Sequence, residues 1–119
     1  MGHNYILADD GKTPVECEIL KWADWFQTAN RTVRRTVFVR GIPHDEELAM
    51  ESAVTLGAQG IVISTVFMGI DHNFTGVGPP VLWESMVFDE TGVMDDIQDR
   101  YTSHDEAVVG HAALVELVR

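Results

Sequence analysis

Cysteine is almost absent from this sequence, because Cys17 is the only one among 119 residues. No disulfide can therefore form within the chain, which favours a reducing compartment. Long hydrophobic runs are absent as well: the longest, residues 60–70, contains Ser64 and Thr65 and has about half the length of a membrane span. The first residues show neither the basic nor the apolar segment of a signal peptide. These absences predict a cytoplasmic protein that does not contact membranes.

Positive charge is scarce: 8 Lys and Arg stand against 19 Asp and Glu, a formal net charge of -11 at pH 7. Such a surface repels nucleic acid and anionic membranes and attracts basic partners. The charge argues against direct nucleic-acid binding and favours a partner protein with a basic surface. Half of the basic residues lie in one segment: Arg31, Arg34, Arg35 and Arg40. This cluster predicts either surface ion pairs or a small patch for an anionic ligand.

The composition is that of an ordinary folded protein, with 45% apolar and 23% charged residues. A chain of this length builds one core without a disulfide or a structural metal. No repeat, low-complexity tract or linker divides it. We therefore expect one domain over residues 1–119.

Two patterns near the start predict a hairpin followed by a helix. Asp-Gly at residues 10–11 separates short apolar segments at 5–7 and 15–17 and supplies the turn of a β-hairpin. Apolar residues then recur at helical spacing over 18–30. Trp25 lies off the centre of that apolar stripe, at its margin or exposed.

Three later segments predict strands. Residues 31–40 are rich in β-branched side chains, and 61–70 and 81–88 combine such residues with alternation. The connection between the last two contains two glycines and two prolines, which predict an irregular, rigid loop that displays His72 and Phe74.

Two further helices are expected. Residues 44–56 are rich in helix formers and carry acidic residues in the first turn. Ser103 and the glutamate three residues later form a capping box at the start of a helix over 103–118, with His111 on its apolar stripe. Together the elements predict a single α+β domain: an antiparallel sheet of about five strands, with the helices at 18–30 and 103–118 packed on one face and a third, peripheral helix.

Polar residues near the ends of the two central strands form the one site-like constellation. Asp71 and His72 follow the first strand, Glu84 lies on the next, and His111 lies on the last helix. Imidazole and carboxylate groups can bind a transition metal or act as acid and base. Each also has a structural explanation, since Asp71 can cap a turn and His111 can be a core residue. Glu84 can pair with an arginine of 31–40. No metal, cofactor or catalytic residue is assigned, and His72, Glu84 and His111 stay candidates.

Three segments of the chain are VISTVFMGIDHNFTGVGPPVLWESMVF, RYTSHDEAVVGHAALVELV and KWADWF. In these segments the sequence resembles a family of small uncharacterised proteins encoded by bacteriophages and prophages. The family pattern includes the STVF strand, Asp71-His72, Pro79-Pro80, Glu84, Met86, Arg100-Tyr101 and Gly110-His111. It covers a little over half of the chain, and residues 40–60 stand as an insertion. The resemblance implies a viral accessory protein inside an infected bacterium and implies no activity.

These observations together favour a non-enzymatic protein that binds or inhibits a host protein, such as a defence component whose normal ligand is nucleic acid. Charge complementarity would speed the encounter, and an aromatic anchor such as Trp25 or Phe74 would supply affinity. The residues expected to bind are Trp25, Arg34, Arg35, Asp71, His72, Phe74, Glu84, Tyr101 and His111.

Two alternatives stay open. A protein that binds or sequesters a small anionic ligand, such as a nucleotide signal, would use Arg34, Arg35, His72 or His111. A metal- or histidine-dependent hydrolase would need His72, Glu84 and His111 to converge.

Overall fold

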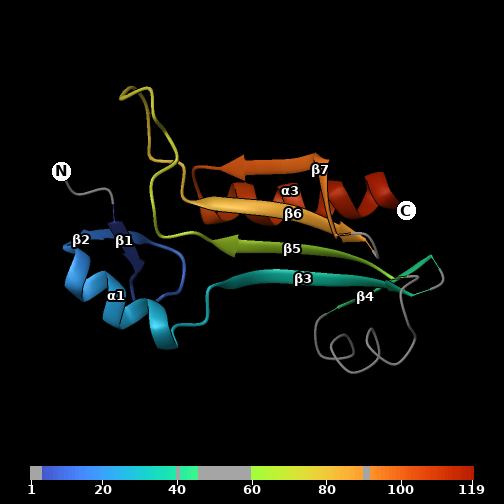
Figure 1. Cartoon of the computed structure of the whole chain (residues 1–119), viewed down its shortest axis with the longest axis horizontal. Coiled ribbons are helices and arrows are strands. Elements are labelled where there is room, and N and C mark those ends of the chain that lie inside the picture. Colours follow the sequence, from blue (N-terminus) through green and yellow to red (C-terminus); the bar gives the residue numbers. More distant parts are fainter. Residues whose placement is uncertain (1–3, 40, 46–59, 90–91) are drawn as a thin grey trace.

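The computed structural model describes residues 4–39, 41–45, 60–89 and 92–119 (Figure 1). Within these ranges lie seven strands and two helices. In chain order they are β1 (Asn4–Leu7), β2 (Pro14–Cys17), α1 (Ile19–Thr28), β3 (Thr32–Val39), β4 (Ile42–Asp45), β5 (Ile61–Phe67), β6 (Trp83–Asp89), β7 (Gly92–Tyr101) and α3 (His104–Val118). Neither helix is long and apolar enough to cross a membrane.

Five strands form an antiparallel sheet in the order β4-β3-β5-β6-β7. The β-branched residues of β3 and β5 suit its centre, where both neighbours supply hydrogen bonds. The strand β7 was not predicted, because its sequence GVMDDIQDRY reads as a polar connection. It is the edge strand beside β6, a position where acidic residues discourage pairing with another chain.

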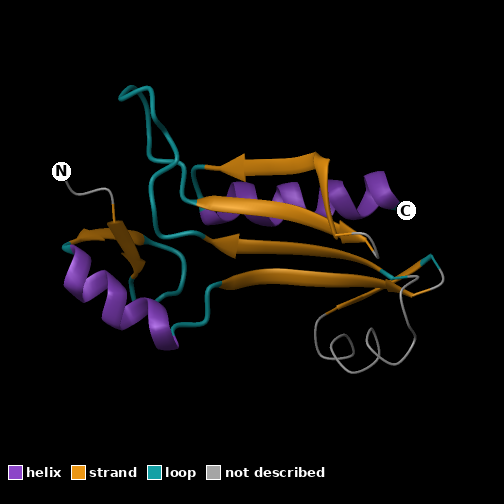
Figure 2. Cartoon of the chain, viewed as in Figure 1, coloured by secondary structure: helices purple, strands orange, loops and turns teal. Residues whose placement is uncertain are grey.

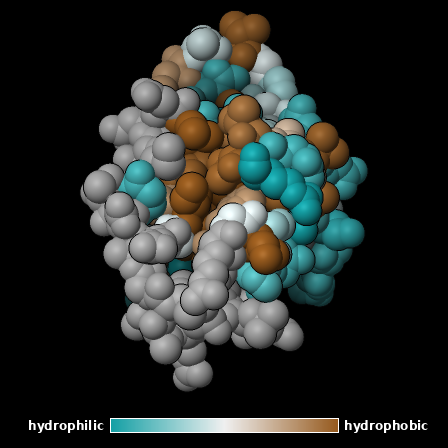
Figure 3. Space-filling view, turned by 90° about the vertical axis from the view of Figure 1, so that its right-hand side faces the viewer, coloured by the Kyte–Doolittle hydropathy of each residue, from teal (hydrophilic) through white to brown (hydrophobic). Residues whose placement is uncertain are grey.

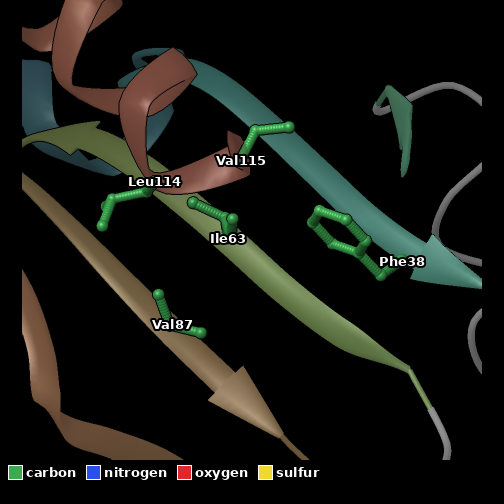
Figure 4. Close-up of a cluster of buried hydrophobic side chains, with 5 residues drawn as sticks. All are labelled: Phe38, Ile63, Val87, Leu114 and Val115. Atoms are coloured by element: carbon green, nitrogen blue, oxygen red, sulfur yellow. The ribbon is translucent and has the colours of Figure 1, made fainter. Parts of the chain in front are cut away.

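One face of this sheet packs against α3 (Figure 1). Successive strand residues point to opposite faces, and the buried residues alternate along both strands: Ile63, Thr65 and Phe67 in β5, and Trp83, Ser85 and Val87 in β6. One apolar cluster joins the sheet to the C-terminal half of α3 (Figure 4): Phe38, Ile63, Val87, Leu114 and Val115. Figure 3 shows apolar side chains gathered at this end of the molecule.

A second apolar cluster lies at the other end of the sheet and contains Phe67, Leu82, Trp83, Tyr101 and Ala107. Residues from the N-terminal elements pack against it, among them Tyr5, Leu7 and Trp25. The ring of Phe67 meets Trp25 edge to face at 5.9 Å and Trp83 at 5.1 Å. These aromatic contacts attach the N-terminal elements to the large sheet.

The predicted placement of two helices on one face of the sheet is wrong. The hairpin β1-β2 forms a separate two-stranded sheet, and α1 packs on β1 (Figure 2). Among the described helices, α3 packs on β3, β5, β6 and β7, whereas α1 reaches the large sheet through the contact of Trp25 with Phe67. The reason is that β1 and β2 form their backbone hydrogen bonds with each other. The hairpin is joined to the chain after β5 by the bridge Asn4–Ile70 and by the hydrogen bond from the Tyr5 amide to the Gly69 carbonyl. It therefore holds α1 at the end of the large sheet instead of over its face.

The predicted third helix at 44–56 is wrong at its start, because His44 and Asp45 belong to β4 and pair with β3. The rest of that segment, and most of the proposed insertion at 40–60, lies outside the described residues. The cap at Ser103 is confirmed, since its hydroxyl accepts a hydrogen bond from the Glu106 amide at 3.1 Å.

Candidate functional site

The candidate catalytic residues His72, Glu84 and His111 do not converge. His111 lies on α3 against the covered face of the sheet, where its ring reaches Thr65. Glu84 pairs in register with Val66, the next residue along β5, and so belongs to the opposite face. His72 lies beyond β5 in the connecting loop, where its Nδ1 is 2.8 Å from the Ile70 carbonyl oxygen. This arrangement offers no shared site for the three side chains.

His111 is the centre of a buried chain of hydrogen bonds. The Tyr101 hydroxyl donates to Ser85 Oγ at 2.9 Å, and Ser85 Oγ lies 2.5 Å from Thr65 Oγ1. Thr65 Oγ1 lies 2.7 Å from Nδ1 of His111, and Nε2 lies 2.8 Å from Thr36 Oγ1. The side chain of His111 is fully buried. It is therefore a core residue whose two ring nitrogens both have partners.

The direction of this chain fixes the tautomer of His111. A hydroxyl has one hydrogen to donate, so Ser85 accepts from Tyr101 and donates onward to Thr65. Thr65 then donates to Nδ1 of His111, and Nε2–H donates to Thr36, whose hydroxyl donates to Asp45 at 3.2 Å. Every hydrogen points toward the Asp45 carboxylate. The structure thus assigns a neutral ring with its hydrogen on Nε2.

The environment keeps this ring uncharged. Burial is the main cause that lowers the pKa of His111 to about 4, the charge of Arg34 adds to it, and Asp45 opposes both. Burial also raises the pKa of Tyr101, which keeps its hydroxyl protonated and able to donate. The network satisfies polar groups inside an apolar interface and fixes how α3 sits on the sheet.

Glu84 pairs with Arg100, not with an arginine of 31–40. The two residues face each other across β6 and β7, and Arg100 Nε lies 2.8 Å from Glu84 Oε2. The Glu84 side chain is only 12% exposed. A carboxylate in that position needs its cation, which explains Glu84 without a catalytic role.

The arginine cluster divides among several contacts. Arg34 forms an ion pair with Asp45 at 3.2 Å, and Arg31 stacks on the Phe26 ring at 3.7 Å. Arg35 is half-buried, and its Nε has no hydrogen-bond partner among the residues that the structure describes. Arg40 lies outside the described residues.

A groove of about 250 Å³ lies between α3 and the hairpin β3-β4. Its lining includes Arg34, Asp45, Glu116 and Arg119. Both arginines are already paired, Arg34 with Asp45 and Arg119 with Glu116, each at 3.2 Å. An anionic ligand would have to displace a carboxylate to reach either guanidinium.

The connection between β5 and β6 is held by its own polar side chains. Asp71 Oδ1 accepts from the amides of Asn73 and Val81, at 2.7 and 2.9 Å, which ties the two ends of the loop together. The Asn73 side chain donates to the carbonyl groups of Val77 and Pro79. The φ angles of 73° and 89° at positions 76 and 78 are in the region that favours glycine, which the sequence supplies at both. The predicted irregular connection is confirmed, since the loop contains no strand or helix of its own and is held by these hydrogen bonds.

The tip of this loop carries two exposed apolar side chains, Phe74 at 84% and Val77 at 79%. In Figure 1 the loop projects beyond the end of the large sheet, away from α3. The rings of His72 and Phe74 lie 5.8 Å apart. We call Phe74 and Val77 the loop tip. Large apolar groups on a rigid exposed support are typical of a protein-binding element.

Two other predicted binding residues, Trp25 and Tyr101, lie in the body of the protein. Trp25 contacts Phe67, and Tyr101 is buried with its hydroxyl on Ser85. Trp25 is half-buried against Phe67, so it is a weaker candidate anchor than the exposed Phe74. Among the described residues, no group of three His, Cys, Asp or Glu side chains is placed to hold a metal ion.

Sequence reasoning missed Val77 in the loop tip and the polar partners of His111. A signal for these partners exists, because Thr65 and Ser85 interrupt the apolar faces of β5 and β6. The pairing of Thr65 with Ser85 depends on the register of β5 against β6, which cannot be read from the sequence.

Comparison of the chain with protein-family models, with curated proteins and with solved structures gives no match.

Proposed function

We propose that this chain is a non-enzymatic binding protein that docks onto a partner protein through the loop tip. The observation that carries the proposal is the 84% exposure of Phe74 on a loop braced by Asp71 and Asn73. A flexible loop would lose conformational entropy on binding, and a braced loop has lost most of it already.

The loop tip has enough apolar surface to anchor a partner. Full burial of a side chain such as phenylalanine or valine contributes about 1.5 to 3 kcal/mol. Exposed singly, such residues are ordinary; here two of them share the end of one projecting loop. An apolar pocket on the partner would take the Phe74 ring, with Val77 beside it.

The partner that suits this molecule is basic around its apolar pocket. The net charge of -11 would steer such a protein toward the chain and raise the association rate. We further propose a host protein whose normal ligand is nucleic acid, because a protein that binds nucleic acid has a basic surface. The alternative of a small anionic ligand has less support, because the arginines of the described groove are paired with carboxylates.

Site-specific crosslinking tests this proposal. A photoreactive phenylalanine analogue at position 74 should crosslink one bacterial protein, and the same analogue at position 20 should not. Leu20 is a suitable control because it is 77% exposed on α1, away from the loop. Purified partner is then titrated with the wild type and the variants Phe74→Ser and Leu20→Ser.

Phe74→Ser should weaken binding at least about thirtyfold, the equivalent of about 2 kcal/mol. Leu20→Ser should bind as the wild type does, and neither change should alter the melting temperature. Equal binding by both variants would refute the loop tip as the recognition element. Binding that does not weaken with added salt would refute the charge argument.

A further inference from the structure

The hydrogen bonds around His111 hold one hydrogen in each contact. Five contacts link six groups in a row, from the Tyr101 hydroxyl through Ser85, Thr65, His111 and Thr36 to the Asp45 carboxylate. Each of the first five groups has one hydrogen to donate when the His111 ring is neutral. The five hydrogens therefore fill the five contacts, and every contact is occupied.

A proton added to His111 disrupts this order. The new Nδ1–H points at the Thr65 oxygen 2.7 Å away, where the Thr65 hydroxyl already donates to the ring. Thr65 must then turn toward Ser85, whose own hydrogen occupies that contact. The surplus hydrogen is forced toward Tyr101, whose hydroxyl lies against Gly110 inside the protein. The result is a buried charge and a buried donor without an acceptor, and both destabilise the packed helix.

The charged groups that face His111 do not cancel this cost. Arg34 on β3 opposes a charged ring, and Asp45 on β4 favours one but is already paired with Arg34 at 3.2 Å. On β7 the titratable groups on this side of the sheet are Tyr101 and Asp99, and the described residues of β5 and β6 supply hydroxyl groups to His111 and no charge. Burial outweighs the carboxylate and lowers the pKa of His111 to about 4.

The helix α3 has a weak point in its middle, because Gly110 is a poor helix former. The turns before Gly110 are held by the cap at Ser103 and by Ala107, which belongs to the second apolar cluster. The turns after it pack on the cluster drawn in Figure 4, through Leu114 and Val115. The two halves of α3 are therefore attached to different parts of the core.

We infer that His111 is an acid-sensitive latch: when its ring takes up a proton, residues 111–118 of α3 leave the sheet and residues 104–110 stay. The five strands keep their own hydrogen bonds, and the N-terminal elements still pack on the second apolar cluster. The released segment uncovers Phe38, Ile63 and Val87. This apolar surface is separate from the loop tip, so the inference does not depend on the proposed function.

Amide hydrogen exchange of the full chain, followed by NMR at pH 7 and pH 5, tests the latch. Protection factors correct for the intrinsic effect of pH on exchange. For residues 112–118 they should fall about twentyfold, because the ring titrates near 6.5 when it is released and near 4 when it is packed. The amides of β5 and β6 should be more strongly protected at both pH values, because they exchange only when the whole domain unfolds. Equal protection in residues 112–118 and in these strands would overturn the inference, since it would mean that α3 opens only in global unfolding.

Two histidine variants identify the group that takes up the proton. His111→Gln should remove most of the pH dependence of protection in residues 112–118. Each variant is compared with itself at the two pH values, so a change in its overall stability does not affect the result. His104→Gln is the matched control, at a histidine in the first turn of the same helix, and should keep the pH dependence of the wild type. Persistence of the pH dependence in His111→Gln, or its loss in His104→Gln, would overturn the assignment of the latch to His111.

Discussion

Gly110 of α3 lies directly against the ring of Tyr101, so closely that a Cβ at position 110 would overlap Cε1, Cζ and the hydroxyl oxygen. The contact brings the helix backbone down to the hydroxyl that begins the His111 network. Glycine in the middle of a helix costs about 1 kcal/mol relative to alanine. That cost is offset by the close approach that it permits.

Gly110→Ala should therefore destabilise the protein, although alanine is the better helix former. Overpacking of a buried contact costs about 1 to 3 kcal/mol, and chemical denaturation should show a loss in that range. In a Tyr101→Leu background the same substitution should be neutral or stabilising, because the ring has gone. Equal effects in both backgrounds would show that the ring is not the obstacle.

Stability should fall as the pH drops below the usual pKa of histidine. In the folded state the pKa of His111 is lowered to about 4, whereas the unfolded chain titrates near 6.5. Between these values the unfolded state binds the extra proton, so the free energy of unfolding decreases as the pH falls. The full loss is on the order of 3 kcal/mol, with no contribution above pH 6.5.

Denaturation of the wild type and His111→Gln between about pH 7 and pH 5 isolates this effect, since carboxylates remain largely ionised there. The wild type should lose stability over this range and His111→Gln should lose much less. His72→Gln, at a histidine in the loop, is the matched histidine control, and the slope of His111→Gln is compared with its slope. A His111→Gln variant with an unchanged slope would assign the proton uptake to another group.

Thr65→Val should cost about 1 to 3 kcal/mol although it preserves the shape of the side chain. The change removes the oxygen that lies between Ser85 and His111 and leaves buried groups without a partner. Thr75→Val, in the exposed loop, is the matched control and should cost less than about 1 kcal/mol. Thermal unfolding of both variants checks the comparison, and equal losses would contradict it.

Removing Arg100 should cost more than removing Arg119. Arg100→Met leaves the Glu84 carboxylate, which is 12% exposed, without its cation, and we expect a loss of about 2 kcal/mol. Arg119→Met breaks a pair whose partner Glu116 is 69% exposed and should cost less than about 0.5 kcal/mol. The double variant Arg100→Met/Glu84→Gln should recover part of the loss, as urea denaturation would show; no recovery would mean that Arg100 acts through packing alone.

Local signals were enough to predict several elements. The turn at Gly11, whose φ angle is 71°, identifies the first hairpin, and the box at Ser103 identifies the start of α3. Alternation identifies β5 and β6, because each has one buried and one half-buried face. In each case the residues that determine the structure are close together in the sequence.

Contacts between segments far apart in the sequence explain the elements that were not predicted or were placed wrongly. The strand β7 contains aspartates that disfavour strands, and it is extended because β6 pairs with both of its ends, residues 92–93 and 98–101. Periodicity shows which side of α1 is apolar but not which sheet that side will cover. The residue that joins α1 to the large sheet is Trp25, which lies off the centre of its stripe.

The candidate site likewise has one part that local sequence predicts and one part that depends on long-range packing. The glycines and prolines of the loop predict the display of Phe74, because turn chemistry is local. The separation of Glu84 from His111 follows from alternation only after the register of β6 against β5 and the position of α3 are known. The sequence contains both residues in apolar surroundings, and only the fold places the sheet between them.

The position of α3 also affects the order of events during synthesis. Leu114 and Val115, which cover Phe38 and Ile63, are made after all the described strands. The pairs β3-β4, β5-β6 and β6-β7 are consecutive in the sequence and can close as hairpins while the chain is still growing, whereas β3 pairs with β5 only after the intervening segment has been made. One apolar face of the nascent sheet therefore stays accessible to chaperones until α3 has left the ribosome. The docking of that helix is the final tertiary step.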